Sequence, residues 1–280
     1  MKQDWDNLII LDACRYDIFK QHNCLEGELE KKLSRSGATR EFIQKNLTSG
    51  EFHDTVYVDG NGHVEKELAG DEFYKIVKTY TNNEHERQGW MPDIVYEKAK
   101  ESYDQHPDKR LLVHFMQPHA PFLGEKAEKI RKELEKDGVE FMMVHKVKEG
   151  RFESKKEDVE FWDLFGAYEA GYISREQLHD LYVENLEIVL EYVEKLLDDI
   201  DGKTVVTSDH GELLGEFTWA HPVKRTGHLG WIYSKKLREV PWLEIDTGER
   251  RDIVAEEPVG SQDVDEEVVK ENLRALGYVD

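Results

Sequence analysis

Short apolar runs, each bounded by polar residues, recur along the chain. They cover residues 8–11, 55–58, 111–115 and 204–207 and are rich in side chains that favour strands. Runs that are apolar at successive positions are typical of strands that are buried on both faces of a parallel sheet. The pattern therefore predicts four buried parallel strands.

Helical patterns lie between these runs. Residues 93–102 predict a helix, and residues 175–197 predict a longer one, because leucine and valine recur there at helical spacing. Strands that alternate with helices along a chain indicate an α/β fold with a mostly parallel sheet.

Two further segments are less regular. Residues 125–156 are densely charged, and we interpret them as a solvated helix pair in preference to a lid over a site. Residues 246–262 are polar and acidic and predict an extended tail, and residues 266–276 predict a short helix that packs back on the same domain. The organisation expected is one large α/β domain over residues 1–245, with the acidic tail and helix over residues 246–280.

The composition narrows the class of protein. The chain has 280 residues and a formal net charge of -22, which argues against nucleic acid and anionic membrane as partners, since both attract Lys and Arg. No apolar run reaches the length of a membrane span, and two cysteines indicate no disulfide framework. We therefore expect a soluble, cytoplasmic protein, and its oligomeric state is left open.

Polar side chains with metal-ligand chemistry follow three of the predicted strands. Asp12 follows the first strand, His119 lies shortly after the third, and Asp209 and His210 follow the fourth. Ligands bind at the carboxyl edge of such a sheet, so we expect these side chains to meet there. Taken alone, Asp12 is explained equally well as a loop cap, and His210 as a structural histidine. Taken together, the clustered residues predict a metal site. Two carboxylates and an imidazole suit Zn²⁺ or Mn²⁺ better than Ca²⁺.

A candidate nucleophile lies at the start of another predicted helix. Ser36 and Thr39 precede an amphipathic stretch at residues 40–47. A hydroxyl at a helix N-terminus lies in a positive field that favours its alkoxide and binds phosphate, and a metal would lower its pKa further. Either residue is explained equally well as a helix cap, so both interpretations stay open.

The sequence around these residues resembles the sulfatase branch of the alkaline phosphatase superfamily. The resembling blocks are residues 7–17, 117–122, 206–216, 237–242 and 273–278, in the order of the family. The resemblance implies a three-layer α/β/α sandwich with a mostly parallel central sheet and a metal at its carboxyl edge. It also implies attack on a phosphate or sulfate ester by a metal-bound nucleophile. The covalent intermediate is then hydrolysed or passed to an acceptor.

The resemblance also implies roles for single residues. Three positions match the metal ligands of the family, namely Asp12, Asp209 and His210. His119 matches a histidine that contacts the substrate oxyanion or the leaving group. A further histidine on the late loop would fit a second metal or a substrate role. We choose His228 as this residue and as a metal ligand, with His221 as its close competitor.

Independently of the resemblance, an anionic substrate of so acidic a protein needs a local positive pocket. The candidates are Arg15, Arg40, Lys224 and Arg225, and Arg15 is the one that we choose.

Two alignments of the nucleophile region differ in their consequences. Ser36-Gly-Ala-Thr-Arg40 matches the looser form of the sulfatase motif, in which the serine is converted to formylglycine. Gly37-Ala-Thr39 matches the phosphoglycerol transferases of the superfamily, in which an unmodified threonine is the nucleophile. We prefer Thr39, because a carboxylate, a threonine and an Asp-His pair make up the metal site of those enzymes.

The prediction is therefore a metal-dependent hydrolase or transferase that acts on a small anionic phosphate ester through Thr39. The first alternative is a sulfatase with formylglycine at Ser36. The second is a member of the superfamily that has lost catalysis and serves as a binding protein. The phosphoglycerol transferases are membrane-anchored and no anchor is expected here, so we do not expect a lipid substrate.

Overall fold

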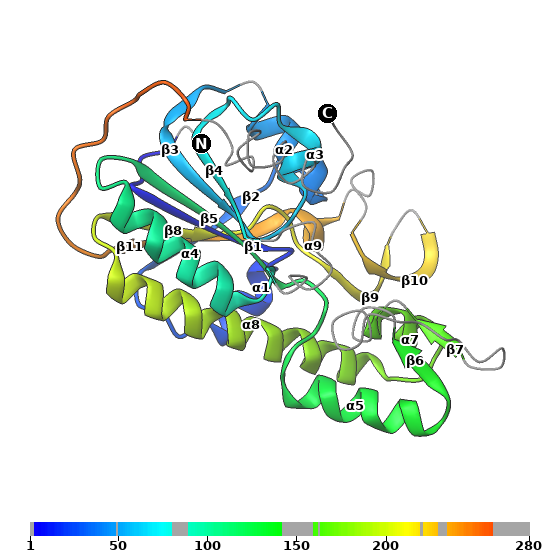
Figure 1. The fold of residues 1–280 in the computed structure, drawn as a ribbon. Helices are drawn as coiled ribbons and strands as arrows, with labels where there is room; N and C mark the ends of the chain where they lie inside the picture. Colours follow the sequence, from blue (N-terminus) through cyan, green and yellow to red (C-terminus); the bar gives the residue numbers. More distant parts are fainter. Residues whose placement is uncertain are drawn as a thin grey trace, which may run out of the picture.

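A seven-stranded sheet forms the centre of the molecule (Figure 1). The structure, a computed structural model, describes residues 3–48, 50–79, 89–141, 159–161, 163–218, 221–228 and 234–259. The strand order is β2-β11-β8-β1-β5-β3-β4. The strands are β1 (Asn7–Asp12), β2 (Glu28–Leu33), β3 (Phe52–Asp59), β4 (Phe73–Lys78), β5 (Arg110–Pro118), β8 (Lys203–Thr207) and β11 (Glu239–Asp246).

The four strands predicted from the apolar runs lie next to one another in this sheet. β8, β1, β5 and β3 are paired in that order, and every pairing is parallel. β4 continues the parallel sheet beyond β3, whereas β11 is antiparallel to both β8 and β2. The prediction of a mostly parallel sheet is confirmed.

Helices cover both faces of the sheet. The helices of the described residues are α1 (Tyr16–His22), α2 (Thr39–Asn46), α3 (Val64–Glu67), α4 (Pro92–Gln105), α5 (Gly124–Lys136), α7 (Leu164–Glu169), α8 (Arg175–Asp199) and α9 (Lys235–Arg238). Of these, α5 and α7 lie beyond the sheet, beside the smaller strands (Figure 1). α4 and α8 confirm the two helices predicted at residues 93–102 and 175–197. α2 lies where residues 40–47 predicted an amphipathic helix.

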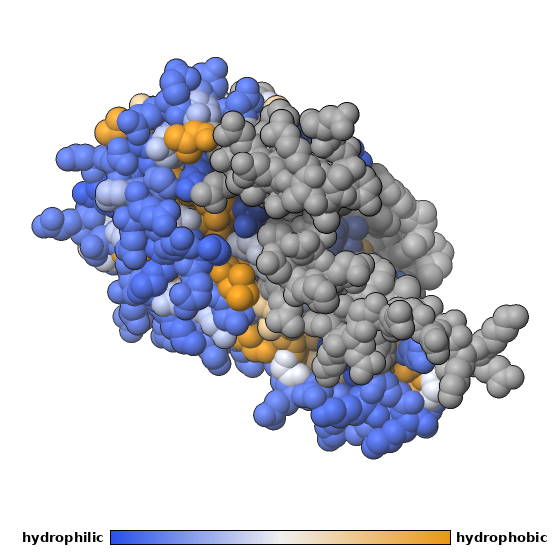
Figure 2. Space-filling view, viewed as in Figure 1, coloured by the Kyte–Doolittle hydropathy of each residue, from blue (hydrophilic) through white to orange (hydrophobic). Residues whose placement is uncertain are grey.

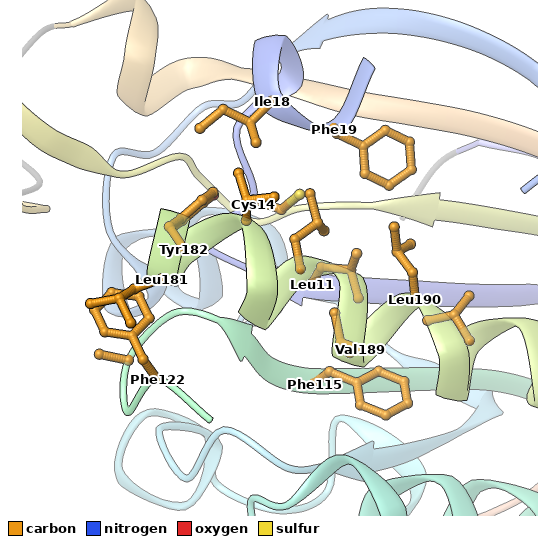
Figure 3. Close-up of a cluster of buried hydrophobic side chains, with 14 of the residues drawn as sticks. Leu11, Cys14, Ile18, Phe19, Phe115, Phe122, Leu181, Tyr182, Val189 and Leu190 are labelled. Carbon is orange, nitrogen blue, oxygen red and sulfur yellow. The ribbon is translucent and has the colours of Figure 1, made fainter. Parts of the chain in front are cut away.

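Successive residues of β1 bury into two different cores. Ile9 and Leu11 belong to the core that α4, α8 and α1 cover, and Leu8 and Ile10 belong to the core that α2 and α3 cover. Figure 3 shows the first core, in which side chains of α8 lie against those of β1 and β5. A sheet buried on both faces by helices is a three-layer α/β/α sandwich, so this prediction is confirmed.

Smaller elements gather at the amino-terminal end of α8 (Figure 1). β9 (Leu213–Thr218) pairs antiparallel with β10 (His221–Gly227), and β6 (Val139–Phe141) pairs parallel with β7 (Val159–Phe161). The charged segment 125–156 was predicted to be a helix pair. α5 confirms its first part, but residues 139–141 form a strand, because Val139 and Phe141 are both buried while Glu140 lies between them. Residues 142–156 lie outside the described residues.

The segment after β11 is extended, as predicted. Residues 247–259 form no helix or strand and cross the amino ends of the strands, where the Val254 N–H donates to Asp108 O and the Glu256 N–H donates to His53 O (Figure 1). The helix predicted at residues 266–276 lies outside the described residues, and the division at residue 245 stays a prediction. Most of the described surface on the face shown in Figure 2 is hydrophilic. No helix in the described part of the chain has the length and apolarity needed to cross a membrane.

Candidate active site at the carboxyl edge of the sheet

Four side chains from three segments meet where the central strands end. Asp12 is the last residue of β1, Asp209 and His210 follow β8, and Thr39 is the first residue of α2. All four are buried, at 3% exposure or less. The Thr39 hydroxyl oxygen Oγ1 lies 3.0 Å from His210 Nε2 and 3.4 Å from Asp12 Oδ1. Three of the four residues predicted as metal ligands therefore form one cluster with the predicted nucleophile.

The local chain conformation directs Thr39 into this cluster. Ala38, in extended conformation, is the N-cap residue of α2, and no side chain caps the helix. Glu41 accepts a hydrogen bond from the Gly37 N–H at 2.8 Å and so fixes the loop before the helix. The interpretation of Thr39 or Ser36 as a helix cap is therefore wrong, because the Thr39 hydroxyl faces His210 and Asp12 instead.

His210 is held as a neutral ring whose Nε2 lone pair points into the cluster and accepts from the Thr39 hydroxyl. Its Nδ1 lies 2.8 Å from Gly211 O, and since a carbonyl oxygen only accepts, Nδ1 carries the proton. Burial lowers the pKa of His210 to about 4, so the ring is neutral at neutral pH. The lone pair of Nε2 faces Asp209 Oδ2 at 3.3 Å and Asp12 Oδ1 at 3.5 Å. This is the arrangement in which histidine binds a metal.

The two carboxylates present one oxygen each to the same point. Asp209 Oδ1 accepts hydrogen bonds from the N–H groups of Ala13 at 3.1 Å and His210 at 2.8 Å, whereas its Oδ2 has no hydrogen-bond partner among the described residues. Asp12 Oδ2 accepts a hydrogen bond from the Asn61 amide. Burial and the negative charge of Asp209 raise the pKa of Asp12 well above its ordinary value. Two buried carboxylates so close together call for a cation.

The donor set fits a tetrahedral divalent ion. Ligand atoms about 2.1 Å from a metal in tetrahedral geometry lie about 3.4 Å apart. Four of the six separations among Thr39 Oγ1, His210 Nε2, Asp12 Oδ1 and Asp209 Oδ2 are 3.0, 3.3, 3.4 and 3.5 Å. Asp209 Oδ2 is buried and has no hydrogen-bond partner among the described residues, so it is available as a ligand atom. These residues fit Zn²⁺ or Mn²⁺ by chemistry and by spacing.

A second cluster forms around Glu212, beside the first. Glu212 is fully buried, its Oε1 lies 3.2 Å from His228 Nδ1, and its Oε2 lies 3.6 Å from His119 Nε2. Burial lowers the pKa of His228, but the charge and hydrogen bond of Glu212 outweigh this and raise it to about 9. His228 is then a cation at neutral pH. Its ring centre lies 4.3 Å from that of His210, so the two clusters adjoin.

The structure therefore separates the predicted site residues into two groups. Asp12, Thr39, Asp209 and His210 share the first cluster. His119 and His228 belong with Glu212, so the role of His228 as a further metal ligand stays a prediction. The side chain of its competitor His221 lies outside the described residues.

Arg15 lies next to the second cluster, and two carboxylates balance its positive charge. Its Nε and Nη2 donate to Asp17 at 3.0 and 2.8 Å, and its Nη1 donates to Glu216 at 2.5 Å and to the backbone oxygen of Glu212 at 3.4 Å. Burial lowers the pKa of Arg15, but these carboxylates more than reverse the effect and raise it. The contacts tie Glu212 to the turn after β1. A substrate-binding role for Arg15 stays a prediction.

Ser36 lies farther from the metal-type ligands than Thr39. Its hydroxyl is fully buried and lies 3.4 Å from the backbone oxygen of Asp209 and 3.2 Å from the Ser34 hydroxyl. Those contacts hold the loop against the turn after β8.

Sequence reasoning missed three residues of the site. Glu212 lies in the block that carried the resemblance but was given no role. Asn61 follows β3, one of the predicted strands, so the rule that located Asp12 and Asp209 would also have located it. His114 lies inside the apolar run of β5, where no signal distinguished it from a core residue.

Comparison with known proteins identifies the fold. No family model matches the sequence, and no curated protein matches it. Among solved structures, the integral membrane lipooligosaccharide phosphoethanolamine transferase EptA from Neisseria meningitidis matches with TM-score 0.53 and 14% identity, covering 86% of this chain and 47% of that one. This chain therefore spans about half the length of EptA.

Two further structures agree. The C-terminal periplasmic domain of EptC from Escherichia coli, in complex with Zn, matches with TM-score 0.51 and 13% identity, covering 86% of this chain and 72% of that one. BT4656, in complex with its substrate D-glucosamine-2-N,6-O-disulfate, matches with TM-score 0.50 and 13% identity, covering 88% of this chain and 72% of that one. The chain has the sulfatase-like fold of the alkaline phosphatase superfamily, as its sequence predicted.

Proposed function

We propose that this chain is a metal-dependent enzyme that hydrolyses or transfers phosphate esters, with Thr39 as its nucleophile. The observation that carries the proposal is the position of Thr39 Oγ1, 3.0 Å from His210 Nε2 and 3.4 Å from Asp12 Oδ1, inside a buried set of metal-type ligands. The Zn complex of EptC, a protein of the same fold, supports a divalent metal at this centre.

Asp12, Asp209, His210 and Thr39 are the residues that would hold the ion. A bound divalent cation would lower the pKa of the Thr39 hydroxyl and offset the negative charge of the ester. The amino end of α2 adds a positive field at the same hydroxyl. Thr39 Oγ1 would then bond to phosphorus while the bond from phosphorus to the leaving oxygen breaks. Water or an acceptor hydroxyl would release the phosphoryl group from Thr39.

The second cluster would bind and protonate the substrate. His228, with a pKa of about 9, supplies a partly buried positive charge next to the proposed centre and can donate to a phosphoryl oxygen. The ring centre of His119 lies 5.0 Å from that of His228, which supports its predicted contact with the oxyanion or leaving group. A small anionic ester fits this histidine pair. A cytoplasmic location stays a prediction.

The nucleophile is tested with matched variants. We expect Thr39→Ala to lose at least about a thousandfold in kcat on 4-nitrophenyl phosphate, and Thr39→Ser to retain part of it, because a hydroxyl is essential. Peptide mass spectrometry of rapidly quenched reactions should find the phosphoryl group on Thr39. Ser36→Ala should remain active. Full activity of Thr39→Ala would contradict the proposal.

Two further measurements separate the alternatives. Conversion of Ser36 to formylglycine would lower the intact mass by about 2 Da through loss of two hydrogens, and together with activity on 4-nitrophenyl sulfate it would favour a sulfatase. Purified protein that contains no metal, and binds neither Zn²⁺ nor Mn²⁺ at micromolar concentration, would favour the inactive binding protein.

A further inference from the structure

A buried histidine beside the proposed metal centre has no role in the proposed reaction. His114 on β5 is fully buried, and its Nδ1 lies 2.9 Å from the hydroxyl of Tyr57 on β3. Its other ring nitrogen, Nε2, has no hydrogen-bond partner among the described residues. The nearest charged atom recorded for it is Asp209 Oδ2, at 3.9 Å, which is itself unpartnered.

The hydrogen bond between Tyr57 and Nδ1 is compatible with either tautomer of His114, because a tyrosine hydroxyl can donate or accept. If the hydroxyl of Tyr57 donates to Nδ1, Nε2 carries the proton and points it toward the carboxylate of Asp209. The opposite tautomer would place the lone pair of Nε2 against the lone pairs of Asp209 Oδ2 in a site without water access. Burial makes such a contact costly, so the Nε2–H tautomer is favoured.

We propose that His114, fixed by Tyr57, is a positioning residue that orients Asp209 for metal binding. Asp209 Oδ1 is held by two backbone N–H groups, at 2.8 and 3.1 Å, and the Nε2–H of His114 would hold the other side of the carboxylate. A contraction of less than about 1 Å converts the 3.9 Å approach into a hydrogen bond. Asp12, His114 and Asp209 offer potential ligand atoms within 4.8 Å of one another. In the Nε2–H tautomer His114 has no lone pair free for a metal, so it acts on Asp209 and is not itself a ligand. The inference rests on the proposed function, since it requires the metal centre.

The inference is tested by metal affinity and not by turnover. Zn²⁺ binding to metal-free protein is measured by calorimetry with a competing chelator for wild type, His114→Ala, His114→Gln and Tyr57→Phe. We expect His114→Ala to bind one metal about 10- to 100-fold more weakly. His114→Gln should recover most of the affinity, because its side-chain amide can place an N–H near the position of Nε2. Tyr57→Phe should show a smaller loss, since the tautomer is no longer fixed.

A matched control and a spectroscopic readout complete the test. His106 is a partly buried histidine whose ring packs against Tyr74 at 5.5 Å, and it has no contact with the centre, so His106→Ala should bind Zn²⁺ as wild type does. The visible spectrum of bound Co²⁺ should be unchanged in His114→Gln and Tyr57→Phe, because the ligands are the same. Should His114→Ala fail to fold, these two variants decide the question.

Three outcomes are distinguishable. Wild-type affinity in His114→Ala would overturn the inference and leave the proposed function intact. A changed Co²⁺ spectrum in His114→Gln, with no recovery of affinity, would make His114 a direct ligand and would also overturn it. A wild-type protein that binds no metal would overturn the proposed function itself.

Discussion

Tyr182 on α8 donates a 2.6 Å hydrogen bond to the backbone oxygen of Ala13, the residue that follows Asp12. The same hydroxyl accepts a 3.0 Å hydrogen bond from the Arg15 N–H. Ala13 has a φ of 60°, a left-handed conformation that costs about 1 kcal/mol or more for a residue with a side chain. Tyr182 thus holds a strained turn closed, and that turn directs Asp12 into the proposed centre.

Removing the hydroxyl should destabilise the fold and weaken metal binding together. Tyr182→Phe would leave Ala13 O and the Arg15 N–H without their buried partner, so we expect the free energy of unfolding to fall by about 1–3 kcal/mol. Zn²⁺ affinity should also fall, because Asp12 is less firmly held. Urea denaturation and calorimetry measure the two effects. Tyr192→Phe, at a partly exposed tyrosine on the same helix, is the control and should change neither.

The sequence pattern predicted the strands that are buried on both faces of the sheet. β1 and β5 are buried on both faces, and each contains a run of successive apolar residues. β2 was missed because its sequence, ELEKKL, is that of an exposed edge strand, and its pairing with β11 joins segments some two hundred residues apart. No local pattern reveals such a pairing.

The residues of the site also divide into those that local sequence predicts and those whose role depends on the folded structure. Asp12 and Asp209 were predictable because Asp12 ends β1 and Asp209 closely follows β8, and strand ends of a parallel sheet meet at one edge. The function of Glu212 depends on its distances to His119 and His228, which the sequence does not encode locally. Arg15 was predicted from its charge alone, and its neutralisation by Asp17 and Glu216 depends on how β9 folds back over the turn.

A comparison of two arginines tests whether Arg15 supports the structure or binds substrate. Arg15→Met removes a side chain that is 5% exposed and bridges two carboxylates, so we expect a loss of about 3 kcal/mol in the free energy of unfolding. Arg40→Met removes an arginine that is 70% exposed and pairs with Glu67 at 2.7 Å, and it should cost less than about 1 kcal/mol. Urea denaturation distinguishes the two.

The opposite result would favour the role predicted from the sequence. If Arg15→Met unfolds like wild type but raises KM on a phosphate ester, then Arg15 contacts the substrate. Arg15→Lys is informative in either case, because lysine cannot reproduce the paired contact with Asp17.

Metal-free protein should gain stability when the charge of Asp12 is removed. The pKa of Asp12 is raised by burial and by Asp209, so its ionised form opposes folding when no cation is present. We expect Asp12→Asn to raise the melting temperature of the metal-free protein. Zn²⁺ at about a hundred times its Kd should stabilise wild type by about 2.7 kcal/mol but have little effect on the variant. Scanning calorimetry with and without chelator checks both. A variant that is less stable without metal, or that Zn²⁺ still stabilises fully, would contradict this.

The pair formed by His228 and Glu212 should make stability depend on pH in a defined window. His228 has an ordinary pKa of 6.5 and a raised pKa of about 9 in the folded metal-free protein. Because folding raises this pKa, the stabilisation is fully present below pH 6.5 and is lost as pH rises toward 9. The groups that face His228 are Glu212, Asp12 and Asp209, which favour its charge, and the rings of His119 and His210.

The test compares urea denaturation of chelator-treated wild type and His228→Gln between pH 6 and pH 9.5. Wild type should be the more stable at pH 6, and its advantage should shrink steadily across the window. Glu212→Gln should remove most of the pH dependence while leaving His228 in place, because the hydrogen-bonded charge that raises the pKa is gone. A difference between wild type and His228→Gln that stays constant from pH 6 to 9.5 would show that His228 carries no stabilising charge, and the substrate-binding role proposed for it would lose its physical basis.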